Sequence, residues 1–292
     1  MAVALGLVGA GSRAELHAAQ LAASSDIDFV GVWTRRAAAA QQLANRYDAR
    51  PFTQFRELLA ACDGLCFAVP PAVQSDLGSI AARLGKSVLL ELPIAWDVAG
   101  AEDLAEAVIA GRAVSQVAFT WRYTPAVREF LEARTLDTAP SSGRGRVLRA
   151  PRNASLPANH WRRERSLLFD AVPHVADLLD VALGEIVDVD ATEDENDRVK
   201  LTLEHRLVGP SETTIGSSGT IEDDLAVFEF VGPIGSTVVD CSGAESTADY
   251  AAMIAEFARA VRTGKAHELD VRRGLLVQRV IEAADTKLLL GR

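Results

Sequence analysis

The first 120 residues alternate short, mainly apolar runs with longer stretches whose apolar positions recur every three or four residues. The apolar runs lie at residues 3–8, 29–33, 65–69, 87–90 and 114–119, and the helical stretches at 13–23, 37–46, 55–62, 74–84 and 97–109. Strands without polar alternation are typical of a parallel sheet that is covered on both faces. This half of the chain therefore predicts a parallel sheet built from strand–helix–strand units.

Beyond residue 120 the pattern changes. Helices are predicted at 125–134 and 167–183, and apolar residues then alternate with polar ones at 187–191, 199–203 and 227–230. Such alternation is typical of antiparallel strands with one buried face, and residues 231–236 predict a hairpin turn. Two helices follow at 249–262 and 271–290, whereas residues 138–145, rich in Ser, Gly and Pro, have the composition of a linker. We expect an α/β protein of two domains, residues 1–120 and 121–292.

Composition narrows the class of protein further. The chain has 292 residues, with 30 Lys and Arg against 40 Asp and Glu, which gives a net charge of −10. An acidic chain without a basic block is a poor match for nucleic acid or an anionic membrane surface. No apolar run approaches the roughly 18 residues of a membrane span, and no positive charge precedes the first apolar stretch as in a signal peptide. The chain has only three cysteines, a small and odd number. This favours a cytoplasmic protein with reduced thiols and no metal site.

A glycine-rich turn directly follows the first predicted strand. Its sequence Gly9-Ala10-Gly11-Ser12-Arg13-Ala14 has the form G-x-G-x-x-A and opens a predicted helix. A dinucleotide diphosphate needs backbone N–H donors at close range and the positive end of a helix dipole. Gly9 suits the tight turn and Gly11 the close approach of the ligand, so we expect these residues, with Ser12 and Arg13, to bind a dinucleotide.

The end of the second strand bears on the choice between NAD and NADP. An NAD enzyme usually has Asp or Glu there, to bind the ribose hydroxyls. This chain has Thr34, Arg35 and Arg36 instead. Arginines are unfavourable to the dipole at the start of a helix, and their forked donors suit a 2′-phosphate. The sequence favours NADP and leaves NAD open.

Together with three further segments, this turn resembles the signatures of the Gfo/Idh/MocA oxidoreductases, named for glucose-fructose oxidoreductase and inositol dehydrogenase. Residues 67–71 (FAVPP) are similar to the family's diproline segment, residues 85–93 (GKSVLLELP) to its G-K-H-V-L-V-E-K-P segment, and residues 170–179 to its D-x-x-x-H helix. The resemblance covers nearly the whole chain. It implies a Rossmann dinucleotide-binding domain, then a C-terminal α/β domain with an open, mostly antiparallel sheet that often joins subunits into a homo-oligomer.

The same resemblance implies an activity. Family members transfer hydride between NAD(P) and a hydroxyl or carbonyl carbon, commonly of sugars, inositols or related cyclic compounds. By position in the motifs, Val69, Pro70, Pro71 and Glu91 would lie near the nicotinamide. The peptide bond before the motif's proline is typically cis, which predicts a cis bond between Leu92 and Pro93.

The chain also departs from the family pattern. Leu92 occupies the place of the E-K-P lysine, which typically contacts the reacting oxygen and the nicotinamide ribose; a leucine does neither. Gln74 replaces the histidine that often follows the diproline, and the glycine run that usually precedes the D-x-x-x-H helix is absent. Two interpretations stay open: an active oxidoreductase, and a non-catalytic NADP-binding protein that has lost the lysine.

Asp170 and His174 are the first candidates for catalysis. They lie four residues apart on a predicted helix and so share one face. Histidine suits proton transfer in both directions near neutral pH, and Asp170 would orient it or bind a substrate hydroxyl. A buried structural histidine beside a carboxylate has the same spacing, and only the family resemblance favours the catalytic role.

Two other segments add candidates. Arg122 and Tyr123 follow the last strand of the parallel sheet, where ligands bind in such folds. Tyr123 is a second proton donor in place of the missing lysine, although packing explains it equally well. His160 and Trp161, followed by two arginines, offer an aromatic surface and positive charge to a polar substrate.

Overall fold

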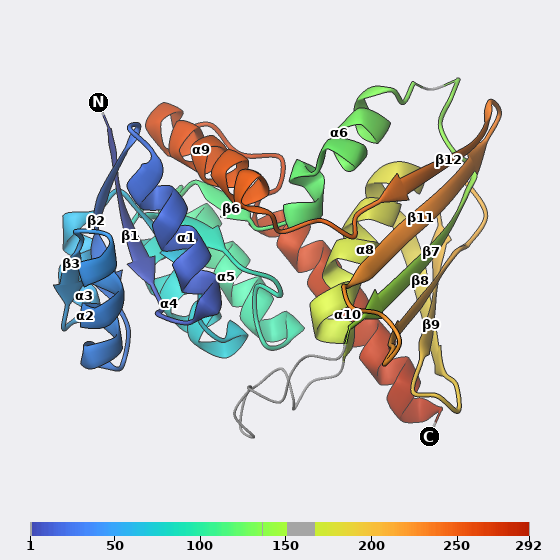
Figure 1. Ribbon diagram of the computed structural model, residues 1–292, viewed down its shortest axis with the longest axis horizontal. Helices are drawn as coiled ribbons and strands as arrows, with labels where there is room; N and C mark the ends of the chain where they lie inside the picture. Colours follow the sequence, from blue (N-terminus) through green and yellow to red (C-terminus); the bar gives the residue numbers. More distant parts are fainter. Residues whose placement is uncertain (1, 136, 151–166, 292) are drawn as a thin grey trace. The chain divides into compact units, whose positions relative to one another are not determined.

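The computed structural model describes residues 2–135, 137–150 and 167–291. These residues form two compact units, which are described separately (Figure 1). The first unit comprises residues 1–118 and 246–278, and the second comprises residues 119–245 and 279–292. The boundary after residue 118 lies close to the expected one. The expected division into 1–120 and 121–292 placed residues 246–278 in the second domain, whereas in the structure they belong to the first unit.

The first unit is built on a six-stranded parallel sheet in the order β3-β2-β1-β4-β5-β6. This is the predicted Rossmann-type sheet, and its strands β1, β4, β5 and β6 are almost wholly buried. The strands are β1 (Val3–Val8), β2 (Ile27–Trp33), β3 (Arg50–Phe52), β4 (Gly64–Phe67), β5 (Ser87–Leu90) and β6 (Ser115–Val117). The helices between them are α1 (Ser12–Ala23), α2 (Ala37–Arg46), α3 (Phe55–Ala61), α4 (Pro71–Arg83) and α5 (Val98–Gly111).

The returning segment completes the first unit. Helix α9 (Thr247–Thr263) packs on α1 and β1, and α10 (Val271–Leu290) begins in this unit. Strand β6 is an edge strand, and the returning segment covers it with hydrogen bonds: Val117 N donates to Leu269 O at 2.7 Å, and Gln116 Nε2 donates to Met253 O at 3.0 Å. These contacts explain why residues so late in the chain belong to the first domain.

The second unit holds a six-stranded sheet in the order β12-β11-β7-β10-β9-β8. All neighbours are antiparallel except β7 and β10, so the sheet is mixed and mostly antiparallel, as predicted. The strands are β7 (Ser142–Arg149), β8 (Ile186–Glu193), β9 (Val199–His205), β10 (Ser211–Ser217), β11 (Leu225–Gly232) and β12 (Gly235–Asp240). The described residues of this unit also include the 3-10 turn η1 (Thr120–Tyr123), the helices α6 (Pro125–Glu132) and α8 (Leu167–Leu183), and the end of α10. Helix α8 packs on β7, β9 and β10.

The linker predicted at residues 138–145 is wrong over its second half. Residues from Ser142 onwards form β7, which lies between β10 and β11 in the sheet. Gly143 and Gly145 pair with Phe230 and Phe228 of β11. A Cβ on Gly145 would collide with the Phe228 ring at 2.4 Å, and a Cβ on Gly143 would make a tight contact with the Phe230 ring at 3.2 Å. Close packing inside a sheet, rather than chain flexibility, therefore accounts for these glycines.

Candidate active site

The glycine-rich turn has the local geometry that a diphosphate requires. Gly9 has a φ of +129°, and a Cβ there would collide with the carbonyl oxygen of Ala68 at the end of β4. Gly11 has extended backbone, and a Cβ added to it would meet no described atom within 4 Å. Helix α1 starts at the next residue, without a side-chain cap on its first N–H groups. Open space and N–H donors without a side-chain cap at a helix start fit a bound phosphate.

The arginines of the 2′ region lie beside this turn. Strands β1 and β2 run parallel with Val8 opposite Trp33, and Gly9 N donates to Trp33 O at 2.9 Å. Thr34 is half-buried, while Arg35 and Arg36 are exposed. Two guanidinium groups at the uncapped start of α2 fit an anionic ligand there.

The ends of β4 and β5 contribute the motif residues Val69, Pro70, Pro71 and Glu91. Ala68 N donates to Val8 O at 2.8 Å, so the diproline segment follows a strand that ends beside the glycine turn. Pro71 begins α4, which therefore starts three residues earlier than the predicted 74–84. The peptide bond between Leu92 and Pro93 is cis, as predicted, and the Leu92 side chain is buried.

Gln74 shapes the backbone around the missing lysine. Its Oε1 accepts from Glu91 N at 2.9 Å, and its Nε2 donates to Glu91 O at 2.8 Å and lies 3.1 Å from Ile94 O. Gln74 is fully buried. In the sequence, Gln74 was noted only as a departure from the family pattern. In the structure, its hydrogen bonds hold the backbone segment that contains Leu92.

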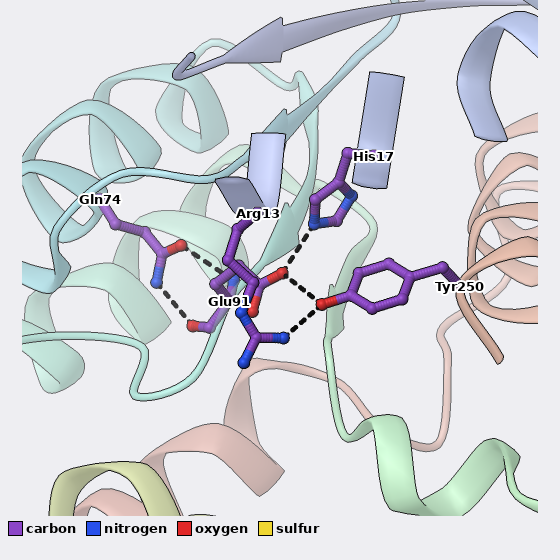
Figure 2. A network of polar contacts seen from close by, with 5 residues as sticks. All are labelled: Arg13, His17, Gln74, Glu91 and Tyr250. Carbon is purple, nitrogen blue, oxygen red and sulfur yellow. Dashed lines mark hydrogen bonds and ion pairs between the residues drawn. The ribbon is translucent and has the colours of Figure 1, made fainter. Parts of the chain in front are cut away.

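A polar network joins this segment to α1 and α9 (Figure 2). His17 Nε2 lies 2.7 Å from Glu91 Oε1, and the Tyr250 hydroxyl donates to the same oxygen at 3.5 Å. Arg13 Nη1 donates to the Tyr250 hydroxyl. His17 and Tyr250 were not among the predicted site residues. His17 stands one helical turn after Arg13, a spacing that offers a signal, but nothing local to Tyr250 points to it.

In the second unit, His174 lies on α8 against the turn η1. Its ring stacks on Trp121, with centroids 5.0 Å apart and an angle of 20° between the planes. His174 is 6% exposed and Trp121 4%. Asp170 stands one turn earlier on the same helix and is half-buried. The stacking fixes the plane of the imidazole ring, which is the first requirement of a directed proton donor.

Arg122 and Tyr123 are also held inside the second unit. Arg122 Nη1 pairs with Asp177 Oδ1 at 3.4 Å, and both side chains are largely buried. The Arg122 charge thus already faces a carboxylate, one turn beyond His174 on α8. Tyr123 is buried under the guanidinium of Arg128, which lies 5.1 Å from its ring centroid. His160 and Trp161, the other predicted substrate residues, lie outside the described residues.

Arg149, at the end of β7, was not predicted. Its Nη1 pairs with Asp224 Oδ2 at 2.6 Å, and its Nη2 donates to the backbone oxygen of Asp170 at 3.5 Å. The sheet thereby contacts the first turn of the helix that carries Asp170 and His174. Because the contact joins residues far apart in sequence, no local pattern could have indicated it.

The three cysteines are unsuited to nucleophilic or metal chemistry. Cys62, Cys66 and Cys241 are buried and free, and burial raises the pKa of the Cys62 thiol to about 11. Such thiols are poor nucleophiles and poor metal ligands. Within the described parts of the chain, no group of three or more His, Cys, Asp or Glu side chains is arranged to hold a metal ion. None of the described helices combines the length and apolarity needed to cross a membrane.

Comparisons with known proteins agree with this geometry. Residues 3–119 match the sequence model of the Gfo/Idh/MocA oxidoreductases, described as an oxidoreductase family with an NAD-binding Rossmann fold. Inositol 2-dehydrogenase from Rhizobium meliloti is 29% identical over 188 residues, which is 63% of this chain but only 56% of that protein.

Solved structures share the whole fold. GenD2 from gentamicin A biosynthesis, crystallised with NAD, is 20% identical with a TM-score of 0.87, over 100% of this chain and 95% of that one. A myo-inositol dehydrogenase from Corynebacterium glutamicum is 21% identical with a TM-score of 0.87, over 100% and 98% of the two chains. At these identities the likeness establishes the fold alone.

Proposed function

Because residues 3–119 match the sequence model of the Gfo/Idh/MocA oxidoreductases, we propose that this chain belongs to that family and is an NAD(P)-dependent oxidoreductase acting on a small polyol or keto compound. The reaction moves hydride between the nicotinamide and a hydroxyl or carbonyl carbon of a sugar-like or cyclic substrate. The observation that carries this proposal is the turn at Gly9 and Gly11, with its open space and its uncapped helix start. When bound there, the dinucleotide supplies or accepts the hydride.

The first unit would hold the dinucleotide mainly through its backbone. The N–H groups in the first turn of α1, beginning at Ser12, would bind the diphosphate, and the Arg13 side chain would add a positive charge. Arg35 and Arg36 are exposed at the start of α2, and Thr34 offers a hydroxyl. We propose that these three residues bind the 2′-phosphate of NADP and make it the preferred cofactor.

The second unit would supply the proton. Reduction of a carbonyl carbon leaves an alkoxide oxygen, to which the His174 imidazole donates; in oxidation the same ring accepts the hydroxyl proton. Trp121 fixes the ring plane, and Asp170 stands on the same helix face to bind a substrate hydroxyl or to orient the ring. Tyr123 is a second donor on η1.

Leu92 favours an alternative function. Its aliphatic side chain neither binds the reacting oxygen nor carries a proton, and a fold that binds NADP without catalysis needs nothing more at that position. Exchanging Leu92 for lysine separates the two interpretations. A gain of reductase activity in Leu92→Lys, from an inactive wild type, would assign the chain to the non-catalytic class with a catalytic ancestry.

Calorimetry with NADPH and NADH, followed by a panel of cyclic ketones, keto-sugars and polyols, tests the proposal. We expect NADPH to bind, and the absorbance of the dihydronicotinamide to fall when a suitable ketone is added. A protein that binds neither dinucleotide would refute the function as a whole. A protein that binds NADPH but turns over neither ketones nor polyols supports the alternative.

A further inference from the structure

Tyr250 occupies an unusual position for a tyrosine. It lies in the first turn of α9, in the segment that returns to the first unit from the far end of the chain, and is fully buried. Its ring meets the His17 ring edge-on, with centroids 5.3 Å apart and planes at 88°. A buried hydroxyl must find hydrogen-bond partners or carry a desolvation cost. The partners it finds are Arg13 and Glu91.

These two partners come from the two motifs that the dinucleotide would meet. Arg13 is the second residue of α1, directly after the glycine turn, and Glu91 directly follows β5 beside Leu92. Figure 2 shows the hydroxyl between the guanidinium and the carboxylate, with His17 reaching the same carboxylate oxygen as the hydroxyl. One side chain from the end of the chain therefore connects both cofactor motifs.

The direction of the hydrogen bonds follows from His17. This ring is fully buried, and its Nδ1 has no hydrogen-bond partner among the described residues. A hydrogen on Nδ1 would be a buried, unsatisfied donor, so the geometry favours the tautomer with hydrogen on Nε2, which donates to Glu91. Glu91 is then the acceptor for His17 and for Tyr250 as well. The Tyr250 oxygen keeps its lone pairs for the Arg13 guanidinium, so each hydrogen bond orients the next.

We propose that Tyr250 is a positioning residue for the dinucleotide: it holds the guanidinium of Arg13, a residue of the first turn of α1, in one orientation at the Tyr250 hydroxyl. The inference rests on the proposed function. A cation at the start of a helix opposes the helix dipole, so an unrestrained arginine gains little by staying there. A long side chain also loses substantial rotamer freedom when it is fixed. By fixing Arg13 before the ligand arrives, Tyr250 removes that cost from diphosphate binding.

A double-mutant cycle in NADPH affinity tests this role. Tyr250→Phe removes the hydroxyl and keeps the ring against His17, and Arg13→Ala removes the group that is positioned. Arg13→Ala loses a charge-assisted contact to the diphosphate, which predicts about tenfold weaker NADPH binding. Tyr250→Phe keeps that charge and loses only the hydrogen bond that orients it, so we expect about fivefold weaker binding. If Tyr250 acts through Arg13, the double variant binds about tenfold more weakly than wild type, not fiftyfold.

Tyr47→Phe is the matched control. The Tyr47 hydroxyl also binds a carboxylate on α1, but its partner is Glu15, to whose Oε1 it donates at 2.5 Å, and not Glu91. We expect its NADPH affinity to equal that of wild type. The thermal midpoint of each variant without ligand is measured in parallel, so that affinity is compared only among folded proteins.

The outcomes separate the inference from the function beneath it. Wild-type protein that fails to bind NADPH would refute the proposed function. Wild-type binding with an unchanged affinity in folded Tyr250→Phe would refute the positioning role alone. Additive losses in the double variant would also refute it, because Tyr250 would then act apart from Arg13. A higher NADPH affinity of Tyr250→Phe would also refute the positioning role, because Tyr250 would then keep Arg13 away from the ligand.

Discussion

In the first unit, the cofactor would meet mostly backbone: the glycine turn, the uncapped start of α1 and two exposed arginines at the start of α2. In the second unit, the described candidates are side chains packed inside the fold, and neighbours orient them, as Trp121 does for His174 and Asp177 for Arg122. The first unit offers open space and exposed charge to a ligand. The second unit offers the His174 ring, held in one orientation by Trp121, beside charged side chains that pair with each other.

This difference bears on how each part responds to substitution. A site made of backbone depends on what glycine leaves free, so an added methyl group is enough to damage it. A site made of packed side chains depends on the polar atoms that are not already used in hydrogen bonds within the fold. Substitutions in the second unit are therefore expected to change both the reaction rate and the stability of the fold. A second buried histidine that has no role in the proposed reaction serves as the control that separates the two effects.

The largest expected effect is that of His174→Ala. If His174 transfers the proton, turnover of a ketone from the panel falls by about 10²–10⁴, while NADPH affinity stays within a factor of about two. His205→Gln is the control, since His205 is buried in the same unit but bonded on both nitrogens, to Gly184 O at 2.8 Å and Ser211 Oγ at 2.9 Å. Its loss should lower the thermal midpoint and spare turnover. Equal turnover in wild type and His174→Ala would make His174 structural.

The two glycines of the turn give the next largest effect and should respond differently. Gly11→Ala places a methyl group where no described atom stands within 4 Å, so the thermal midpoint should not change. NADPH affinity should fall roughly 10- to 100-fold, as for one lost charge-assisted hydrogen bond. Gly9→Ala combines positive φ with a collision against Ala68 and should destabilise the fold by at least ~1–3 kcal/mol. Paired melting and binding curves check both; an unaffected affinity in Gly11→Ala would exclude the turn from the site.

Arg35 gives the smallest of the expected changes. Arg35→Ala should reduce the preference for NADPH over NADH by about tenfold, through loss of a charge-assisted contact to the 2′-phosphate. Affinity for NADH should hardly change. Arg83→Ala removes an equally exposed arginine from the end of α4 and should leave both affinities as they are. Calorimetric titrations with both cofactors provide the test, and a preference that survives in Arg35→Ala would contradict the assignment.

The elements that the sequence predicted best are those with strong local patterns. Helices α8 and α10 have the predicted bounds, and the glycine turn lies where its spacing placed it. Strand β7 was mistaken for a linker because its glycines are explained only by the rings of β11. Strands β3 and β10 were missed: β3 is three residues long, and β10 is mainly polar, Ser-Glu-Thr-Thr at its start.

The site divides in the same way. Gly9, Gly11, Arg35 and Arg36 could be proposed from the sequence because a phosphate site depends on local backbone and charge. Tyr250 and Arg149 were not, because their contacts cross 237 residues to Arg13 and 75 residues to Asp224. Gln74 was noticed only as a substitution, since its hydrogen bonds to residues 91–94 exist only in the folded chain.

Transfer of deuterium from NADPH labelled at the reactive carbon of its nicotinamide tests the central claim most directly. Wild-type protein is incubated with the labelled cofactor and each cyclic ketone or keto-sugar of the panel, and the products are analysed by mass spectrometry. The account predicts one deuterium on the new carbinol carbon of at least one product, in proportion to the NADP formed. Bound NADPH that keeps its deuterium with every ketone, together with NADP that no polyol reduces, would contradict it and favour a protein that binds the dinucleotide without catalysis.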